Sequence, residues 1–69
     1  MLHTKMKYTK AEIENYRNAV IEALLEYGKQ YPKIDINTEI EVMKSRSDES
    51  IENYMDFNTP QECAWMFIM

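Results

Sequence analysis

Residues 34–42, IDINTEIEV, decide the predicted fold class because they fit two different structural periods. Every second residue of this stretch is β-branched, and the residues between are polar; the β-branched ones are Ile34, Ile36, Thr38, Ile40 and Val42. Strict alternation of this kind is typical of a strand with one buried face. Residues 51–57 alternate in a similar way, and the polar stretch 44–50 would connect the two strands. The sequence therefore predicts a β-hairpin over residues 34–57.

The same region also admits a helix. Thr38 and Glu41 have the spacing of a capping box, and a helical stripe would follow through Ile40, Met43, Ser47, Ile51 and Tyr54. That single helix would hold Ser45, Ser47 and Ser50 in mid-length, where their hydroxyls compete with backbone hydrogen bonds. We therefore favour the hairpin and keep the helix as the alternative.

Helices are predicted on both sides of this region. Thr9 and Glu12 have the spacing of a capping box, and apolar residues then recur at three- and four-residue steps, at Ile13, Tyr16, Val20, Leu24 and Tyr27. Gly28 is predicted to end this helix in the left-handed conformation, which gives a helix over about residues 10–27. A second helix is predicted to begin at Asn58 or Thr59, with Pro60 in its first turn.

The predicted fold is one small α+β domain over residues 1–69, with a single layer of strands on helices in the order α-β-β-α. A three-helix all-α domain is the alternative, and residues 1–8 are predicted to be a flexible lead-in. Ordering 69 residues at about 1.5 kcal/mol each costs on the order of 100 kcal/mol. A chain of this size buries only about 60% of its unfolded surface. We therefore expect a second chain to supply further burial.

Few residues are suited to catalysis or metal binding. His3 is the only histidine and Cys63 the only cysteine, whereas a zinc site needs three or four nitrogen or sulfur ligands. Gly28 is the only glycine, so neither a glycine-rich phosphate loop nor a calcium loop is expected. The apolar neighbours of Cys63 predict an inert core thiol. We expect no enzyme activity, no catalytic residue, no metal and no cofactor.

The composition also bears on location. The longest unbroken apolar run, residues 63–69, has seven residues, against the roughly 20 that a membrane-spanning helix needs. A single cysteine without a secretory segment is typical of a reducing compartment. The net charge of −4 disfavours direct binding to phosphate backbones. We expect a cytoplasmic protein that binds neither membranes nor nucleic acid directly.

The negative charge is concentrated in the second half of the chain. Residues 34–69 carry two basic and eight acidic residues, whereas residues 1–33 carry six basic and four acidic ones. In a strand, the acidic residues of 34–42 would share the solvent face, about 6.7 Å apart at two-residue spacing. Such a row is either an ordinary solvated face or a mimic of a phosphate backbone. The predicted acidic partner-binding face comprises Asp35, Glu39, Glu41, Glu49 and Glu52.

The C-terminal segment is apolar on every side. A surface helix normally carries only one apolar stripe, so we expect this one to be central to the fold or covered by another chain. Tryptophan, phenylalanine and methionine are also enriched at the centres of protein interfaces. The predicted apolar interface comprises Trp65, Met66, Phe67 and Met69.

Together these features predict a non-enzymatic, small acidic interaction protein that binds and inhibits or regulates a larger partner, one that handles nucleic acid. In size, acidity and lack of catalytic residues, the chain resembles small inhibitors encoded by phages or mobile elements, such as anti-CRISPR proteins. This resemblance is one of general type and assigns no functional position. The alternative is a self-associating structural or small-ligand-binding module that forms a homodimer through its apolar C-terminal segment.

Overall fold

The structure is a computed structural model that describes residues 7–69. This part of the chain forms four helices and no strand: α1 (Lys10–Gln30), α2 (Ile36–Ser45), α3 (Asp48–Phe57) and α4 (Pro60–Ile68). The predicted α+β fold with a hairpin over residues 34–57 is therefore wrong. The all-helical alternative has the right class, but the middle of the chain forms two helices instead of one.

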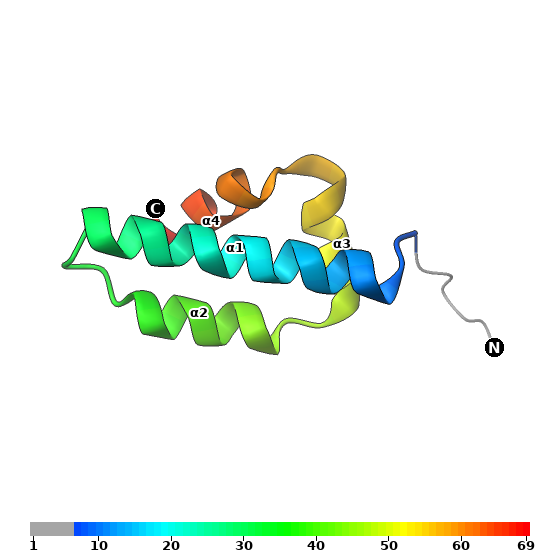
Figure 1. Cartoon of the computed structure of the whole chain (residues 1–69), viewed down its shortest axis with the longest axis horizontal. Helices are drawn as coiled ribbons and strands as arrows, with labels where there is room; N and C mark the ends of the chain where they lie inside the picture. Colours follow the sequence, from blue (N-terminus) through cyan, green and yellow to red (C-terminus); the bar gives the residue numbers. More distant parts are fainter. Residues whose placement is uncertain (1–6) are drawn as a thin grey trace.

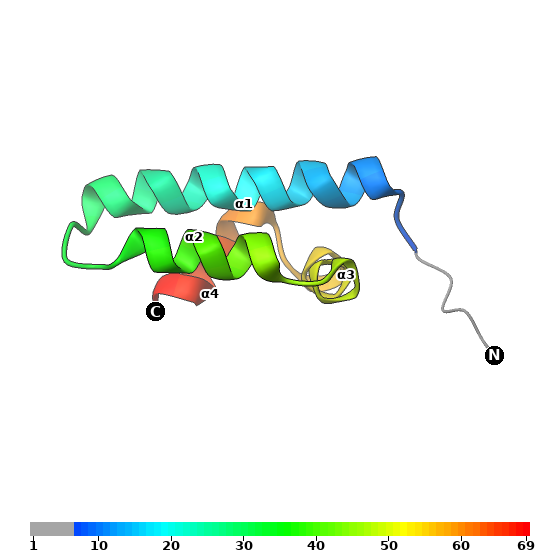
Figure 2. The same cartoon turned by 90° about the horizontal axis from the view of Figure 1, so that it is seen from below.

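Helix α1 is the longest element, and the others are arranged around it. Helix α2 runs back beside α1 (Figure 1), and α4 packs on α1 from another side. Helix α3 crosses near the beginning of α1, and Figure 2 shows α3 end-on while α1 runs across the view. The shared core draws on all four helices and consists of Ile13, Val20, Leu24, Ile40, Met43, Ile51, Cys63 and Ala64.

Helix α1 begins where the sequence predicts and ends later. The Thr9 hydroxyl accepts the backbone N–H of Glu12 at 3.1 Å, and the Glu12 carboxylate accepts that of Thr9 at 2.8 Å. Gly28 lies inside the helix without a positive φ, so its predicted role as a left-handed terminator is wrong. A Cβ at this position would lie 3.1 Å from the side chain of Ile36. Gly28 therefore allows the start of α2 to approach α1 closely.

Helix α2 replaces the first predicted strand because Asp35 caps it. The Asp35 carboxylate accepts hydrogen bonds from the backbone N–H of Thr38 at 3.3 Å and from its hydroxyl at 2.7 Å. These bonds, the one from the hydroxyl first, lower the pKa of Asp35. Ile40 and Met43 then lie on the buried side of the helix. Ile36 and Ile40 fit both the strand period and the helix period, so the cap distinguishes the two structures.

The serines that argued against a long helix mark the break between α2 and α3. Ser45 is the last residue of α2, and the Ser47 hydroxyl caps α3 by accepting the backbone N–H of Ser50 at 3.2 Å. Arg46, between them, has an extended backbone. The hydroxyls are therefore at helix ends, where side chains satisfy backbone groups that have no helical partner.

Helix α4 begins at the predicted point. Thr59 is its cap, Pro60 is in the first turn, and Glu62 completes a capping box with Thr59. Cys63 is fully buried, as predicted, together with Ala64. Helix α4 runs back toward the end of α1 (Figure 1), where Trp65 lies against Tyr27 and Tyr31.

Candidate functional site

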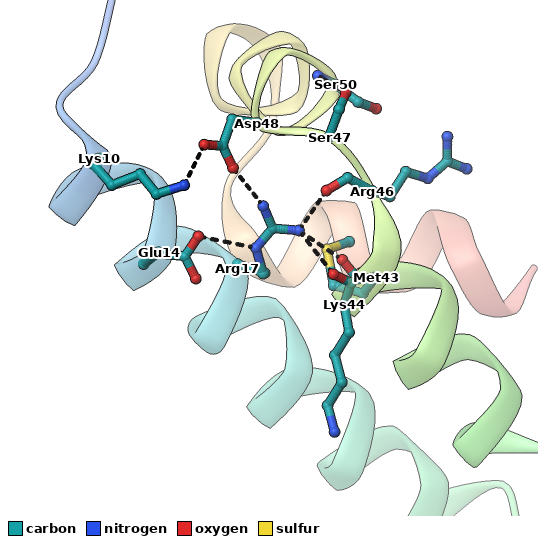
Figure 3. Close-up of polar contacts among 9 residues, drawn as sticks. All are labelled: Lys10, Glu14, Arg17, Met43, Lys44, Arg46, Ser47, Asp48 and Ser50. Atoms are coloured by element: carbon teal, nitrogen blue, oxygen red, sulfur yellow. Dashed lines mark hydrogen bonds and ion pairs between the residues drawn. The ribbon is translucent and has the colours of Figure 1, made fainter.

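A buried arginine on α1 joins α2 to α3 (Figure 3). Arg17 is only 7% exposed. Its Nη1 donates to the carbonyl oxygens of Met43 at 2.9 Å and Arg46 at 2.8 Å, and its Nη2 donates to Asp48 at 2.8 Å. Lys10 also reaches Asp48, at 2.6 Å. The last carbonyl oxygens of a helix lack helical partners. Arg17 supplies hydrogen-bond donors to those at the end of α2 and, through Asp48, fixes the turn into α3.

The acidic residues on one side of α3 bind the beginning of the described chain; they are Asp48, Glu52 and Asp56. Glu52 accepts the backbone N–H of Tyr8 at 3.0 Å. Asp56 accepts Lys7 Nζ at 2.8 Å and the Tyr8 hydroxyl at 2.9 Å. These two bonds, with the one from Lys7 the stronger influence, lower the pKa of Asp56. This acidic stripe therefore holds the fold together, and residues 1–6 of the predicted lead-in lie outside the described part.

The strand that would have aligned the predicted acidic face is absent from the described residues. Asp35 is occupied in capping α2. Glu39 and Glu41 line separate surface depressions. Glu49 is exposed on α3, whereas Glu52 is buried. The geometric reason for grouping these five residues is therefore lost.

The four predicted apolar interface residues divide into two groups. Phe67 is half-buried, and its ring lies 5.8 Å from that of Tyr54 in an edge-on arrangement. Trp65, Met66 and Met69 remain 40%, 50% and 82% exposed. Helix α4 therefore buries one side and presents large apolar side chains on the other, so it is not enclosed by its own domain.

Trp65 is held in place by aromatic contacts although much of it is exposed. Its ring centroid lies 5.4 Å from that of Tyr27 in an edge-on arrangement and 6.0 Å from that of Tyr31 in a tilted one. Edge-on and tilted pairs at these separations are favourable. We call Tyr27, Tyr31 and Trp65 the aromatic cluster; contacts within the domain set the orientation of its rings.

Beside the aromatic cluster, two adjoining depressions form a groove between α1 and α4. Tyr27 and Gln61 line both depressions. We call the whole feature the α1–α4 groove; its lining residues are Ala19, Glu22, Ala23, Glu26, Tyr27, Asn58, Gln61, Glu62, Trp65 and Met66. Small side chains on α1 leave the space, and the aromatic cluster closes one end.

Three carboxylates border the α1–α4 groove, and all three are exposed. The Glu62 carboxylate accepts the backbone N–H of Thr59 at 2.8 Å, and the Glu26 carboxylate lies 3.4 Å from Lys29. Glu22 forms no ion pair within residues 7–69. Sequence reasoning missed Glu22 and Glu26 as site residues, although their four-residue spacing places them on one side of the helix.

The Cys63 thiol and the Tyr16 hydroxyl, which could take part in catalysis, are buried or partly buried. Burial raises the pKa of the Cys63 thiol and that of the Tyr16 hydroxyl. The Tyr16 hydroxyl donates to the carbonyl oxygen of Asn58 at 2.9 Å. In the part of the chain that the structure describes, no three histidine, cysteine, aspartate or glutamate side chains gather as metal ligands; His3 lies outside it.

Comparison of the chain with protein families, curated proteins and solved structures gives no match. Among the described residues, no helix combines the length and the apolar character that crossing a membrane requires. The functional assignment therefore depends on the geometry of the exposed side of α4 and of the groove beside it.

Proposed function

We propose that this protein is a non-catalytic interaction module that binds a larger protein through the exposed side of α4 and inhibits or regulates it. One observation carries the proposal: Trp65 is fixed by two tyrosine rings and yet 40% exposed, next to a half-exposed Met66. Aromatic and methionine side chains at the centre of an interface contribute strongly to affinity once they are covered.

The exposed apolar residues near Trp65 are contiguous, which distinguishes them from the scattered apolar residues of an ordinary surface. One further depression, at the end of the domain, is lined only by aromatic and apolar side chains: Tyr31, Ile34, Trp65, Ile68 and Met69. A preorganised patch loses little conformational freedom on binding, which favours affinity. This patch supports protein binding over a purely structural role for α4.

The charge of the protein supports a partner with a basic surface. The net charge is −4, and proteins that handle nucleic acid carry basic surfaces for the phosphate backbone. A bound acidic module would compete with nucleic acid for such a surface, which is how we propose that inhibition occurs. Because the only cysteine is a free buried thiol, we place this activity in a reducing compartment, the cytoplasm.

Capture of partners by two variants tests the proposal. Met66→Glu places a charge on the exposed side of α4, whereas Phe57→Glu places the same charge on an 82% exposed residue that lines none of the depressions described above. We expect immobilised wild-type protein and Phe57→Glu to retain the same host protein, and Met66→Glu to lose it. Circular dichroism checks that both variants are folded. Equal retention by the two variants would contradict the proposal.

Self-association is the second candidate function, favoured by the wholly apolar lining of the depression between Tyr31 and Met69. Two copies would meet through the same patch across a twofold axis. Light scattering over a hundred-fold range of concentration tests this candidate. A mass that rises to that of a dimer, and that Met69→Glu at an 82% exposed residue of this depression returns to that of a monomer, would favour self-association over binding to a different protein.

A further inference from the structure

The two sides of α4 carry similar aromatic arrangements that differ in one respect. On one side, the guanidinium of Arg46 lies 5.9 Å from the ring centroid of Tyr54 and 5.6 Å from that of Phe67. Glu39 borders the same depression. Cations over aromatic faces at such distances are attracted by the electron-rich ring. This side of the domain therefore holds a cation, aromatic rings and a carboxylate, all from its own chain.

On the other side, the aromatic cluster and the carboxylates of the α1–α4 groove have no such cation. Within residues 7–69, the only guanidinium or ammonium over an aromatic ring is that of Arg46. Lys29 pairs with Glu26 at 3.4 Å, and both side chains are mostly exposed. The groove therefore has the rings and the negative charge of a cation site, and no cation of residues 7–69 lies over those rings.

Three carboxylates border the groove, and within residues 7–69 the one ammonium paired with any of them is that of Lys29, with Glu26. Glu22 and Glu26 are four residues apart on α1, a spacing at which like charges repel. Glu62 adds a third carboxylate from α4. On α3, by contrast, Asp48 and Asp56 bind Lys10 and Lys7. A positive group from outside would relieve this repulsion.

We propose that the α1–α4 groove binds an arginine side chain of a basic segment in the partner protein, with the guanidinium paired to Glu22 and Glu26 and stacked beside Tyr27, which lines the same depression and lies 5.4 Å from Trp65. This inference rests on the proposed function and names the chemistry that the partner presents. Arginine fits better than lysine because its planar guanidinium can both stack on a ring and donate two parallel hydrogen bonds to a carboxylate.

The only tryptophan of the chain is Trp65, so its fluorescence reports directly on the groove. The probe is a capped hexa-arginine peptide titrated into the full chain, with hexalysine as the comparison. We expect saturable quenching by hexa-arginine, with weaker binding of hexalysine. The double variant Glu22→Gln, Glu26→Gln should bind hexa-arginine about ten-fold more weakly. The matched control Glu41→Gln, Glu49→Gln removes the same charge elsewhere and should stay within about two-fold of wild type.

Three results would overturn the inference: quenching that does not saturate, equal affinity for the two peptides, or equal weakening by the two double variants. The last would mean that net charge alone attracts the peptide. Partner capture separates this inference from the proposed function. Retention of the partner by Glu22→Gln, Glu26→Gln but not by Met66→Glu would reject the arginine site and support binding through α4. Retention of the partner by both Met66→Glu and the Glu22→Gln, Glu26→Gln variant would reject the proposed function itself.

Discussion

Replacing Arg17 with methionine should strongly destabilise the fold, because it removes the guanidinium that connects three helices. Methionine keeps a long apolar side chain in the same place, so the main loss is polar. The carbonyl oxygens of Met43 and Arg46 lose donors at 2.9 and 2.8 Å. Each hydrogen bond to a charged group contributes about 1.5–3 kcal/mol. Counting these two bonds at the lower limit gives a loss of about 3 kcal/mol in the free energy of unfolding.

The expected loss in the free energy of unfolding does not include the ion pair between Arg17 and Asp48, because the Asp48 side chain is 25% exposed and keeps Lys10 as a partner. Urea unfolding followed by circular dichroism measures the loss. In a domain of this size, 1 kcal/mol corresponds to a shift of about 4–8 °C in Tm, so thermal melts should show it as well. Lys44→Met is the matched control, since it removes an exposed charge 3.8 Å from Glu41 and should cost under about 0.5 kcal/mol. Equal stability of the two variants would refute the assigned role of Arg17.

Further predictions concern the caps, the core and pH. Thr59→Ala should lose about 1 kcal/mol of stability through the missing cap of α4, and an unchanged urea midpoint would contradict the capping box. Leu24→Ala should lose about 2–5 kcal/mol because it opens a cavity in a fully buried position; a loss below 1 kcal/mol would place Leu24 outside the tight core. The lowered pKa values of Asp48 and Asp56 mean that the folded state binds protons at these carboxylates less readily than the unfolded chain. Their contribution is therefore present above the ordinary value of 3.8 and is lost as the pH falls through the lowered pKa values. Melts between pH 6 and pH 2 should show Tm falling in the acid range, with a smaller fall in Asp56→Asn.

The parts of the fold that local chemistry determines could be predicted from the sequence. The capping box at Thr9 and the pairing of Asn58 or Thr59 with Pro60 place the starts of α1 and α4 correctly, because these signals lie within a few adjacent residues. The end of α1 was mispredicted because a glycine near a helix end has two explanations. Gly28 serves close packing against Ile36, a contact between helices that local patterns do not reveal.

The middle of the chain was mispredicted because its alternation satisfies two periods at once. The deciding signals were the caps at Asp35 and Ser47, which the sequence analysis did not identify. A second determinant is not local: Arg17 holds the end of α2 from 26 residues away in the chain. No window of adjacent residues contains that interaction.

The candidate site could be predicted only in part. The apolar character of α4 pointed to Trp65 and Met66, which the structure leaves exposed; their role in an interface stays a prediction. Glu22 and Glu26 were not identified, because the groove arises only when α4 packs beside them on α1. The acidic residues of 34–42 were assigned to one shared surface because a strand was predicted there, and that strand does not form.

The central claim is that the exposed side of α4 binds the partner. Nuclear magnetic resonance tests it most directly, by following the amide and Trp65 indole signals of isotope-labelled protein as the captured partner is added. We predict that signals from Trp65 and Met66 shift or broaden at substoichiometric partner, while those of Glu41 and Phe57 stay unchanged. Changes confined to α2 and α3, with the Trp65 indole signal unmoved, would contradict the claim.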